Sequence, residues 1–195
     1  VICGFGRTGN WFGCDTYNIK PDIITMAKGI SSGYIPLSGI MVGKRVTDTI
    51  INEGGEFYHG YTYSGHPVAC AVAIENLKII REENLIEYSS KTSIYLEERM
   101  KEIADHPLVG EVRMKSYIGA VELVKNKEKR EMFEETGVTG GICRDYCSQN
   151  GLVMRAVRDG MIFCPPLIFT NDNVDELVDK LKRSLDQTHN HISKS

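Results

Sequence analysis

The sequence predicts a mixed α/β protein that is built from two parts. In the first part, short β-branched runs alternate with loops and lead into a long helical segment, a pattern typical of layered α/β folds. In the second part, alternating strand patterns and amphipathic helical patterns follow one another, which indicates a smaller α+β domain. We therefore predict the later portion of a large α/β domain over residues 1–83, including a connecting helix, and a small C-terminal α+β domain over residues 84–195.

Three apolar runs in the first part predict buried strands, and two segments predict helices. The runs are VIC at the amino end, DIITM at residues 22–26 and LSGIMVG at residues 37–43. The segment KRVTDTIINEGG predicts a short helix that is stopped by its two glycines. A longer helix is expected to begin near Pro67, because proline is favoured in the first helical turn.

The second part is expected to begin and end with a helix. The stretch LIEYSSKTSIYLEERMKEIADH has one apolar helical face, and TNDNVDELVDKLKRSLDQTH predicts a closing helix capped by Thr170 or Asn171. Between them, LVGEVRMKSYIGAVELV predicts strands, TGGICRDYCSQNG predicts a helix, and LVMRAVRDGMIFCPP predicts a hairpin that turns at residues 158–160. The tail NHISKS is expected to be frayed.

Composition and charge exclude several classes of function. With 42% apolar and 25% charged residues, the chain has the composition of a soluble globular protein. A net charge of only -3 and the lack of a long basic stripe argue against a nucleic-acid partner. No apolar run approaches the roughly 18 to 20 residues of a membrane span and no signal peptide is visible, so we expect a cytoplasmic protein with no membrane partner. Because the chain starts without methionine inside an apolar run, we interpret it as a segment of a longer protein.

The cysteines predict no metal site. Cys143 and Cys147 lie one helical turn apart, but zinc needs two further ligands at a suitable spacing, and none is evident. We therefore expect reduced, buried cysteines and no metal. The six cysteines are Cys3, Cys14, Cys70, Cys143, Cys147 and Cys164.

Lys28 is the first candidate for a chemical role. It follows the run DIITM by two residues, and ligands of open α/β sheets bind beyond the carboxyl ends of the strands. Its neighbours Ala27 and Gly29 are small enough to let a ring approach the backbone. In a crevice that excludes water the neutral amine of a lysine is favoured, and it can attack an aldehyde to form a Schiff base. The alternative is a solvent-exposed lysine with no chemical role.

The loop before Pro67 is the second candidate. In HGYTYSGHPVACA, Thr62 supplies a hydroxyl, Gly60 and Gly65 allow close approach to the backbone, and a helix begins just afterwards. This combination suits the binding of a phosphate group. The alternative is that Ser64 simply caps the helix.

Four motifs, in this order, resemble the class III (omega) aminotransferases, which are pyridoxal-phosphate enzymes of fold type I. The motifs are GFGRTGNWFG, PDIITMAKGISSGYIPLSG, YTYSGHPVACA and FCPPLIFT, and the resemblance extends from Val1 to about Leu185. It implies that Lys28 holds pyridoxal 5'-phosphate (PLP) as a Schiff base. It also implies that Tyr61 and Thr62 contact the cofactor phosphate of the neighbouring subunit, in a homodimer or a dimer-based tetramer.

The resemblance implies a reaction as well. The protein is expected to move an amino group from an amine or omega-amino acid to a keto acid such as pyruvate, with Lys28 carrying a proton between the substrate and the cofactor. The family also uses an aspartate at the pyridine nitrogen, a phosphate loop and a ring-stacking aromatic residue, all of which we expect upstream of Val1. This segment alone is therefore expected to be inactive.

Arg155 is the candidate for substrate binding. A planar guanidinium can hold a carboxylate through two parallel hydrogen bonds, which lysine cannot do. Arg155 lies nine residues before Cys164, where the resembling family carries its carboxylate-binding arginine. Arg158 is the alternative, although its position in the predicted turn favours a solvated side chain.

The same residues allow three other interpretations. A PLP decarboxylase or aminomutase of the same fold would use the same lysine and phosphate contacts. A non-catalytic, truncated dimerisation fragment would keep only the fold. A nucleotide-binding module is disfavoured, because GFGRTG lacks the third glycine and the later acidic residue of that motif.

Overall fold

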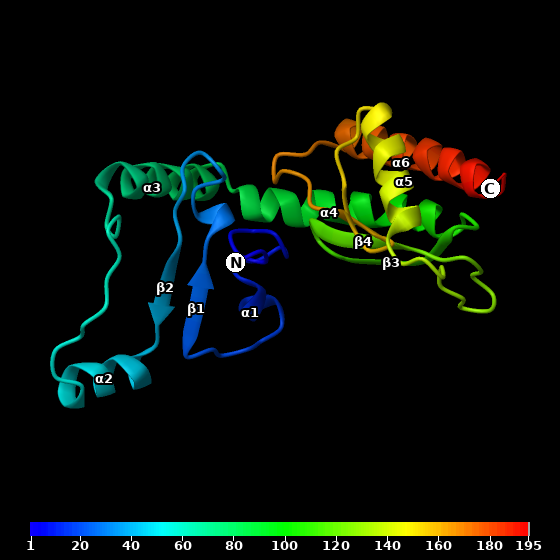
Figure 1. Cartoon of the computed structure of the whole chain (residues 1–195). Coiled ribbons are helices and arrows are strands. Elements are labelled where there is room, and N and C mark those ends of the chain that lie inside the picture. The colour runs from blue at the N-terminus through cyan, green and yellow to red at the C-terminus, as the bar shows by residue number, and fades with distance from the viewer. Residues whose placement is uncertain (195) are drawn as a thin grey trace. The chain divides into compact units, whose positions relative to one another are not determined.

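The computed structural model describes residues 1–194 and divides the chain into two compact units. Unit 1 comprises Val1–Glu87, and unit 2 begins at Tyr88. Figure 1 shows the elements of both units, coloured along the chain. The boundary predicted from the sequence, between residues 83 and 84, lies four residues before the boundary between the two units, which falls between Glu87 and Tyr88. The assignment of the units to a large and a small domain stays a proposal.

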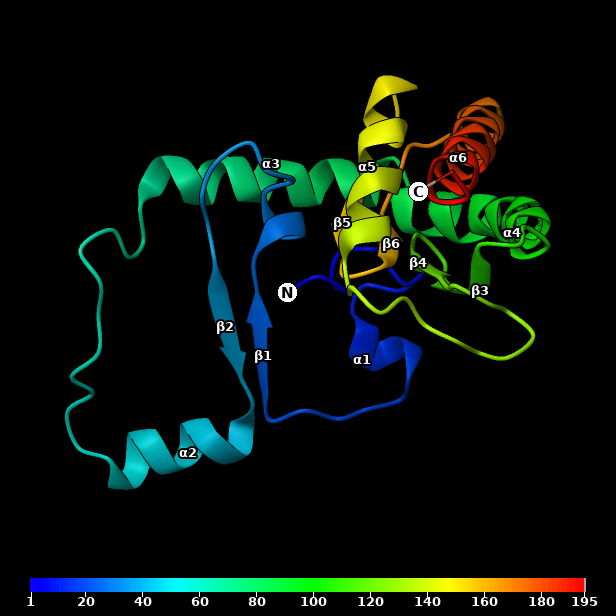
Figure 2. The same ribbon diagram turned by 45° about the vertical axis from the view of Figure 1, so that its right-hand side comes forward.

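The sheet of unit 1 has two antiparallel strands, β1 (Ile23–Met26) and β2 (Gly39–Val42), which lie side by side in Figure 2. They confirm the strand predictions for these two runs. The prediction that both are buried is wrong, because the side chains of Ile23 and Met41 are 51% and 54% exposed. A two-stranded sheet leaves its faces open unless other elements cover them, and an apolar run does not reveal which element would do so.

The amino-terminal run VIC forms no strand, so this prediction is wrong. Residues 1–3 are exposed, and the chain after them folds back on itself. The Phe5 N–H donates to the Trp11 carbonyl at 2.6 Å, and the Gly6 N–H donates to the Asn10 carbonyl at 3.1 Å. The glycines of this segment favour turns, and these turns take the backbone groups that a strand would have used.

The helices of unit 1 agree with the sequence patterns. Helix α2 (Lys44–Glu53) is followed by Gly55, whose left-handed φ of 64° favours glycine and ends the helix. Helix α3 (Pro67–Glu82) begins at its proline, as predicted. The short helix α1 (Gly13–Thr16) is a single turn that periodicity could not reveal.

Unit 2 is built on a four-stranded antiparallel sheet with the strand order β3-β4-β6-β5. This arrangement confirms the strand and hairpin predictions for the second part of the chain. Long helices accompany the sheet, and all of them match predicted helical segments. The elements are α4 (Leu85–Ala104), β3 (Val109–Lys115), β4 (Ile118–Leu123), α5 (Val138–Gln149), β5 (Arg155–Val157), β6 (Gly160–Phe163) and α6 (Asn171–Ile192).

The core of unit 2 collects apolar side chains from its sheet and its helices. Removing each large side chain of this kind from water stabilises the fold by about 1.5 to 3 kcal/mol. Unit 2 therefore has one continuous core that its sheet and its helices share. Fully buried members include Leu96 and Met100 of α4, Val121 of β4, Met161 of β6, and Leu181 and Leu185 of α6.

Helix α6 tests two predictions that were made from the sequence, the residue that caps it and the fraying of the tail after it. Thr170 is the cap of α6, and its hydroxyl accepts the Asn173 N–H at 3.3 Å. The prediction of a frayed tail is wrong up to Ile192, because α6 continues to that residue and the Tyr146 hydroxyl lies 3.0 Å from the His191 Nδ1. Ser195 lies outside the described residues.

The burial of the cysteines agrees with the prediction for only two of them. Cys143 and Cys147 are buried in α5, and the contact between their thiols, together with burial, raises the pKa of the Cys143 thiol. A thiol of raised pKa is a poor nucleophile. The others are exposed or half-buried, because they lie in the sparsely covered unit 1 or on a surface loop: Cys3, Cys14, Cys70 and Cys164.

Residues 1–194 offer neither a cluster of metal ligands nor a helix that could span a membrane. Within this range, no group of three or more His, Cys, Asp or Glu side chains could hold a metal ion. No helix of the same range combines the length and the apolar character that crossing a membrane requires.

Candidate active site

Lys28 lies just beyond the carboxyl end of β1, where it opens the 3-10 helix η1 (Lys28–Ile30). Its backbone is left-handed, with φ at 49°, and a non-glycine residue adopts this conformation at a cost of about 1 to 2 kcal/mol. Such a conformation persists only where neighbouring groups hold it, and it is often found at functional sites. The turn is thus a fixed and slightly strained support for the lysine side chain.

The side chain of Lys28 is exposed in this chain. The chain by itself therefore does not withdraw the Lys28 side chain from water. Strand position and small neighbours locate a lysine, but they do not determine which elements cover it.

Contacts from unit 1 hold the turn of Lys28. The Ser31 N–H donates to the Lys28 carbonyl at 3.2 Å, and the buried Ser31 hydroxyl donates to the Ile35 carbonyl at 2.7 Å. Gly29 packs against Phe5 so closely that an added Cβ would lie 3.0 Å from the Phe5 ring. Gly29 therefore serves close packing here, in addition to leaving room beside the lysine.

Asn76 also contacts this turn, from helix α3. Its side-chain Nδ2 donates to the carbonyls of Gly29 and Ile30, at 3.0 and 3.1 Å. Sequence reasoning missed this residue, because its partners lie more than forty positions away along the chain. A signal was present: Asn76 is a polar residue on the buried face of α3, in helical register with Ala69, Ala73 and Ile80.

The loop that carries Tyr61 and Thr62 is exposed. Tyr61 is 74% exposed, and its backbone N–H donates to the Ser64 hydroxyl at 3.1 Å. The interpretation of Ser64 as the helix cap is wrong, because the Nδ1 of His66 accepts the Ala69 N–H at 3.4 Å and His66 is the N-cap. The Ser64 hydroxyl instead stabilises the loop.

The structure does not bring this loop to Lys28. The loop joins α3 at Pro67, whereas the turn of Lys28 is bound by Asn76. At 1.5 Å per residue, about 14 Å of helix separates Pro67 from Asn76. Within one chain, Thr62 and Lys28 therefore lie near different parts of the same helix.

Arg155 and Arg158 belong to the hairpin of unit 2. Arg155 is the first residue of β5, is exposed, and pairs in register with Ile162 of β6. Arg158 lies in the turn with a left-handed φ of 53° and is also exposed.

Asp159 anchors this hairpin. Its buried carboxylate accepts the backbone N–H groups of Gly137 and Gly140 at 2.9 Å each. These donors lie at the start of α5, where a negative charge is favourable. The anchor holds the hairpin that carries Arg155 against α5, and a sequence pattern that reads Asp-Gly as a turn does not reveal it.

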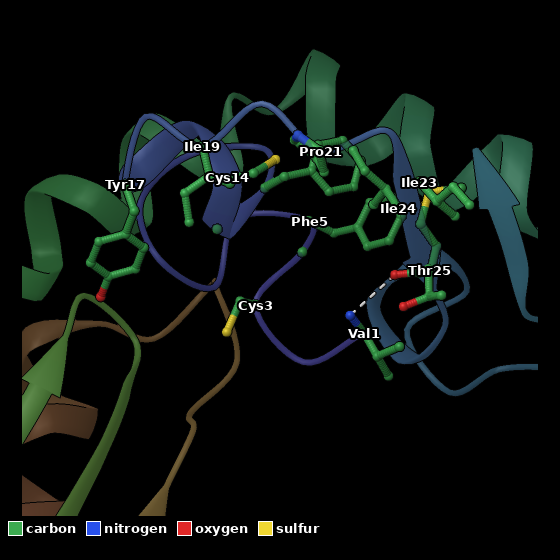
Figure 3. Close-up of a pocket in the computed structure, with 14 residues that line it drawn as sticks. Val1, Cys3, Phe5, Cys14, Tyr17, Ile19, Pro21, Ile23, Ile24 and Thr25 are labelled. Atoms are coloured by element: carbon green, nitrogen blue, oxygen red, sulfur yellow. Dashed lines mark hydrogen bonds between the residues drawn. The ribbon is translucent and has the colours of Figure 1, made fainter. Parts of the chain in front are cut away.

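An apolar cavity of unit 1 has a lining that does not include the candidate residues. Its volume is about 360 Å³, and residues of the amino-terminal segment and of β1 line it, among them Phe5, Ile19 and Ile24 (Figure 3). The amino group of Val1 donates to the Thr25 carbonyl at its edge, at 3.2 Å. The lining contains neither Lys28 nor the loop of Thr62, so the cavity is distinct from the candidate site.

Comparisons with known proteins agree with the motifs. A family model described as aminotransferase class-III matches residues 1–185. A putrescine–pyruvate aminotransferase of Pseudomonas aeruginosa is 54% identical over 189 residues, which are 96% of this chain and 41% of that protein. A chloroplastic gamma aminobutyrate transaminase 3 of Solanum lycopersicum is 40% identical over 195 residues, which are 98% of this chain and 38% of that protein.

A solved structure of the omega transaminase from Pseudomonas jessenii, in complex with PMP, superposes with a TM-score of 0.95 at 41% identity. The match covers 99% of this chain and 43% of that chain. The chain thus spans about two fifths of the length of these relatives. Because the family model covers nearly the whole chain and the likeness includes the backbone, the chain belongs to the class III aminotransferases, PLP-dependent enzymes of fold type I.

Proposed function

We propose that the full-length protein is an aminotransferase that moves an amino group from an amine or omega-amino acid to a keto acid such as pyruvate. The observation that carries the proposal is the position of Lys28, on a strained turn at the end of β1, in a chain of the class III family. The name of the Pseudomonas aeruginosa relative supports pyruvate as the acceptor and a putrescine-like diamine as the first donor to examine. We also propose a cytoplasmic location.

The residues of this chain fit the part of PLP that they are proposed to hold. Lys28 offers an exposed primary amine on a fixed turn, and such an amine can bond to the aldehyde carbon of the cofactor. Tyr61 and Thr62 offer exposed hydroxyls on a loop between glycines, and these can donate to a phosphate. When bound, PLP supplies a ring that accepts the electron pair left behind when a proton leaves the substrate.

Lys28 has two proposed tasks. Its Nζ would hold the cofactor until the incoming amine takes its place, and the same atom would then accept the proton from the substrate α-carbon and deliver it to the cofactor carbon to which it had been attached. A proton carrier must be neutral to accept a proton, and removal from water favours the neutral amine. Because Lys28 is exposed in this chain, we propose that other parts of the full-length protein, or the neighbouring subunit, cover it.

We propose that Tyr61 and Thr62 serve the site of a neighbouring subunit in a homodimer. The separation of their loop from Lys28 along α3 supports this arrangement, since the loop does not approach the lysine of its own chain. The loop also exposes large aromatic side chains, which a second subunit would cover at a gain in free energy. They are Phe57, Tyr58, Tyr61 and Tyr63, with exposures between 64% and 86%.

We propose that Arg155 binds the carboxylate of the keto acid. Its exposed guanidinium can form two parallel hydrogen bonds, and the hairpin that carries it is held firmly by Asp159. Arg158 remains the alternative.

The proposal is tested by supplying full-length protein with PLP, pyruvate and a panel of amines that contains a putrescine-like diamine, β-alanine and an aromatic amine. Alanine should form from pyruvate with at least one of them. Carbon dioxide released from a dialkylglycine added to the panel would instead favour the decarboxylase alternative, and movement of the amino group within one substrate would favour an aminomutase. A folded protein that binds no PLP and converts no amine would favour a non-catalytic fragment.

Thr62→Ala is expected to weaken the binding of PLP by about 1 to 3 kcal/mol, or roughly 5- to 150-fold, the usual effect of losing a hydrogen bond to a charged group. Thr62→Ser keeps the hydroxyl and should bind PLP nearly as wild type does. Equilibrium titration of cofactor-free protein with PLP measures both constants. Equal affinity of the alanine variant and wild type would remove Thr62 from the site.

Gly29→Ala is expected to disturb the turn of Lys28, since the added Cβ would lie 3.0 Å from Phe5. Overpacking of this kind costs about 1 to 3 kcal/mol, so we expect a lower melting temperature and a smaller fraction of protein that holds PLP. Gly39→Ala in β2 is the matched control, because an added Cβ meets no atom within 4 Å there. Absorbance of bound cofactor and thermal unfolding check both variants, and equal behaviour of the two would contradict the close packing at Gly29.

A further inference from the structure

We infer that Asn76 is a positioning residue for Lys28, an inference that rests on the proposed function. Asn76 lies in α3 and is 9% exposed, and its Nδ2 donates to the carbonyls of Gly29 and Ile30 at 3.0 and 3.1 Å. These are the two carbonyls that directly follow Lys28.

The surroundings of Asn76 argue against an incidental role for this residue. The rest of the buried face of α3 is apolar, with Ala69, Ala73 and Ile80 in register with it. Asparagine is a weaker helix former than alanine or leucine, and its buried amide is costly unless it is hydrogen-bonded. Both N–H groups of the amide are used on the turn of Lys28, so this contact compensates for placing a polar residue there.

The two hydrogen bonds fix the direction of the lysine side chain. The carbonyl of Lys28 is held by the Ser31 N–H, and the next two carbonyls are held by Asn76. With all three peptide groups oriented, the left-handed φ of Lys28 cannot relax without breaking a hydrogen bond. Without Asn76, the peptides after Lys28 can rotate, and the Cα–Cβ bond of the lysine then points elsewhere.

Proton transfer is more sensitive to this change than tethering is. The four-carbon stem of lysine can bend to reach the cofactor aldehyde from a shifted backbone. The proton, in contrast, moves only when Nζ is close to the α-carbon and aligned with it, and an error of about 1 Å can cost roughly 100-fold in rate. Asn76 is therefore expected to affect turnover and the proton-transfer step more than substrate affinity.

The test compares Asn76→Leu with Asn150→Leu in the full-length protein. Asn150 is the matched control, because its Nδ2 also donates two hydrogen bonds, to the Ser184 hydroxyl at 2.9 Å and the Gln187 side-chain Oε1 at 2.7 Å, but in unit 2. Both changes keep a similar shape and remove two donors. Asn76→Ala, which continues the alanine pattern of α3, is the second variant if the leucine variant does not fold.

Three measurements separate positioning from stability. Turnover of Asn76→Leu should fall roughly 10- to 100-fold with KM for the amine nearly unchanged, and an amine deuterated at the α-carbon should show a larger isotope effect than with wild type. In cofactor-free protein, the amides of residues 29–31 should exchange with deuterium faster than in wild type. Asn150→Leu should lower the melting temperature similarly while leaving turnover, isotope effect and exchange at residues 29–31 close to wild type.

The outcomes distinguish this inference from the proposed function. If wild type forms alanine from pyruvate but Asn76→Leu, or the alanine variant in its place, keeps wild-type turnover and isotope effect, the positioning role is overturned. The same holds if turnover falls only in proportion to the folded fraction, as in Asn150→Leu. If wild type itself transfers no amino group, the proposed function fails, and the exchange at residues 29–31 still reports whether Asn76 holds the turn.

Discussion

Lys28→Ala is expected to lower the turnover of the full-length protein by several orders of magnitude, because the tether of the cofactor and the proton carrier are lost together. The turn itself should survive, since alanine and lysine have similar backbone preferences and the contacts from Ser31, Gly29 and Asn76 do not involve the lysine side chain. Steady-state rates with a diamine donor and pyruvate measure the effect.

Two further variants sharpen this result. Lys28→Arg keeps the positive charge but has no neutral amine to bond an aldehyde, so it should be as inactive as the alanine variant. Lys20→Ala, an exposed lysine before β1, should stay within about twofold of wild type, as surface substitutions usually do. Substantial turnover by either Lys28 variant would mean that another residue holds the cofactor.

Arg155→Ala is expected to raise KM for pyruvate by roughly 30- to 1000-fold, equivalent to about 2 to 4 kcal/mol for losing a charge-assisted pair in a partly desolvated site. The half-reaction with an amine that lacks a carboxylate has no group for the guanidinium and should be nearly unchanged. Arg155→Lys should recover little, because an ammonium does not reproduce the planar pair of donors.

Arg158→Ala is the matched control for Arg155. Both arginines are exposed on the same hairpin, and only the position differs. Single-turnover kinetics of each half-reaction decides between them. Equal loss in both half-reactions would indicate a structural role for Arg155, whereas loss only in Arg158→Ala would transfer the carboxylate site to that residue.

The sequence predicts the helices and strands of this chain better than it predicts which side chains are shielded from solvent. Helices such as α4 and α6 repeat an apolar face over many residues, so their periodicity identifies them. The hairpin at residues 158–160 follows from local turn chemistry. The run VIC fails for the opposite reason: three apolar residues carry no period, and the glycine-rich turns after them use the backbone groups.

The candidate site likewise combines local features that the sequence predicts with non-local contacts that it does not. Lys28 could be located from the sequence, since a strand end and small neighbours are local features. Its exposed side chain could not be predicted, because covering a residue depends on elements that lie far along the chain. The contact of Asn76 with Gly29 and the contact of Asp159 with Gly137 are equally non-local, and each appears in the sequence only as a polar residue in an unexpected place.

The most direct test of the account is to identify the residue that holds the cofactor. Full-length protein is incubated with PLP, treated with borohydride to fix the cofactor to its lysine, and digested for mass spectrometry of the labelled peptide. We expect a single pyridoxyl group on Lys28, with loss of the cofactor's visible absorbance and no labelling in Lys28→Ala. A label on another lysine, or an active enzyme whose cofactor cannot be fixed to Lys28, would contradict it.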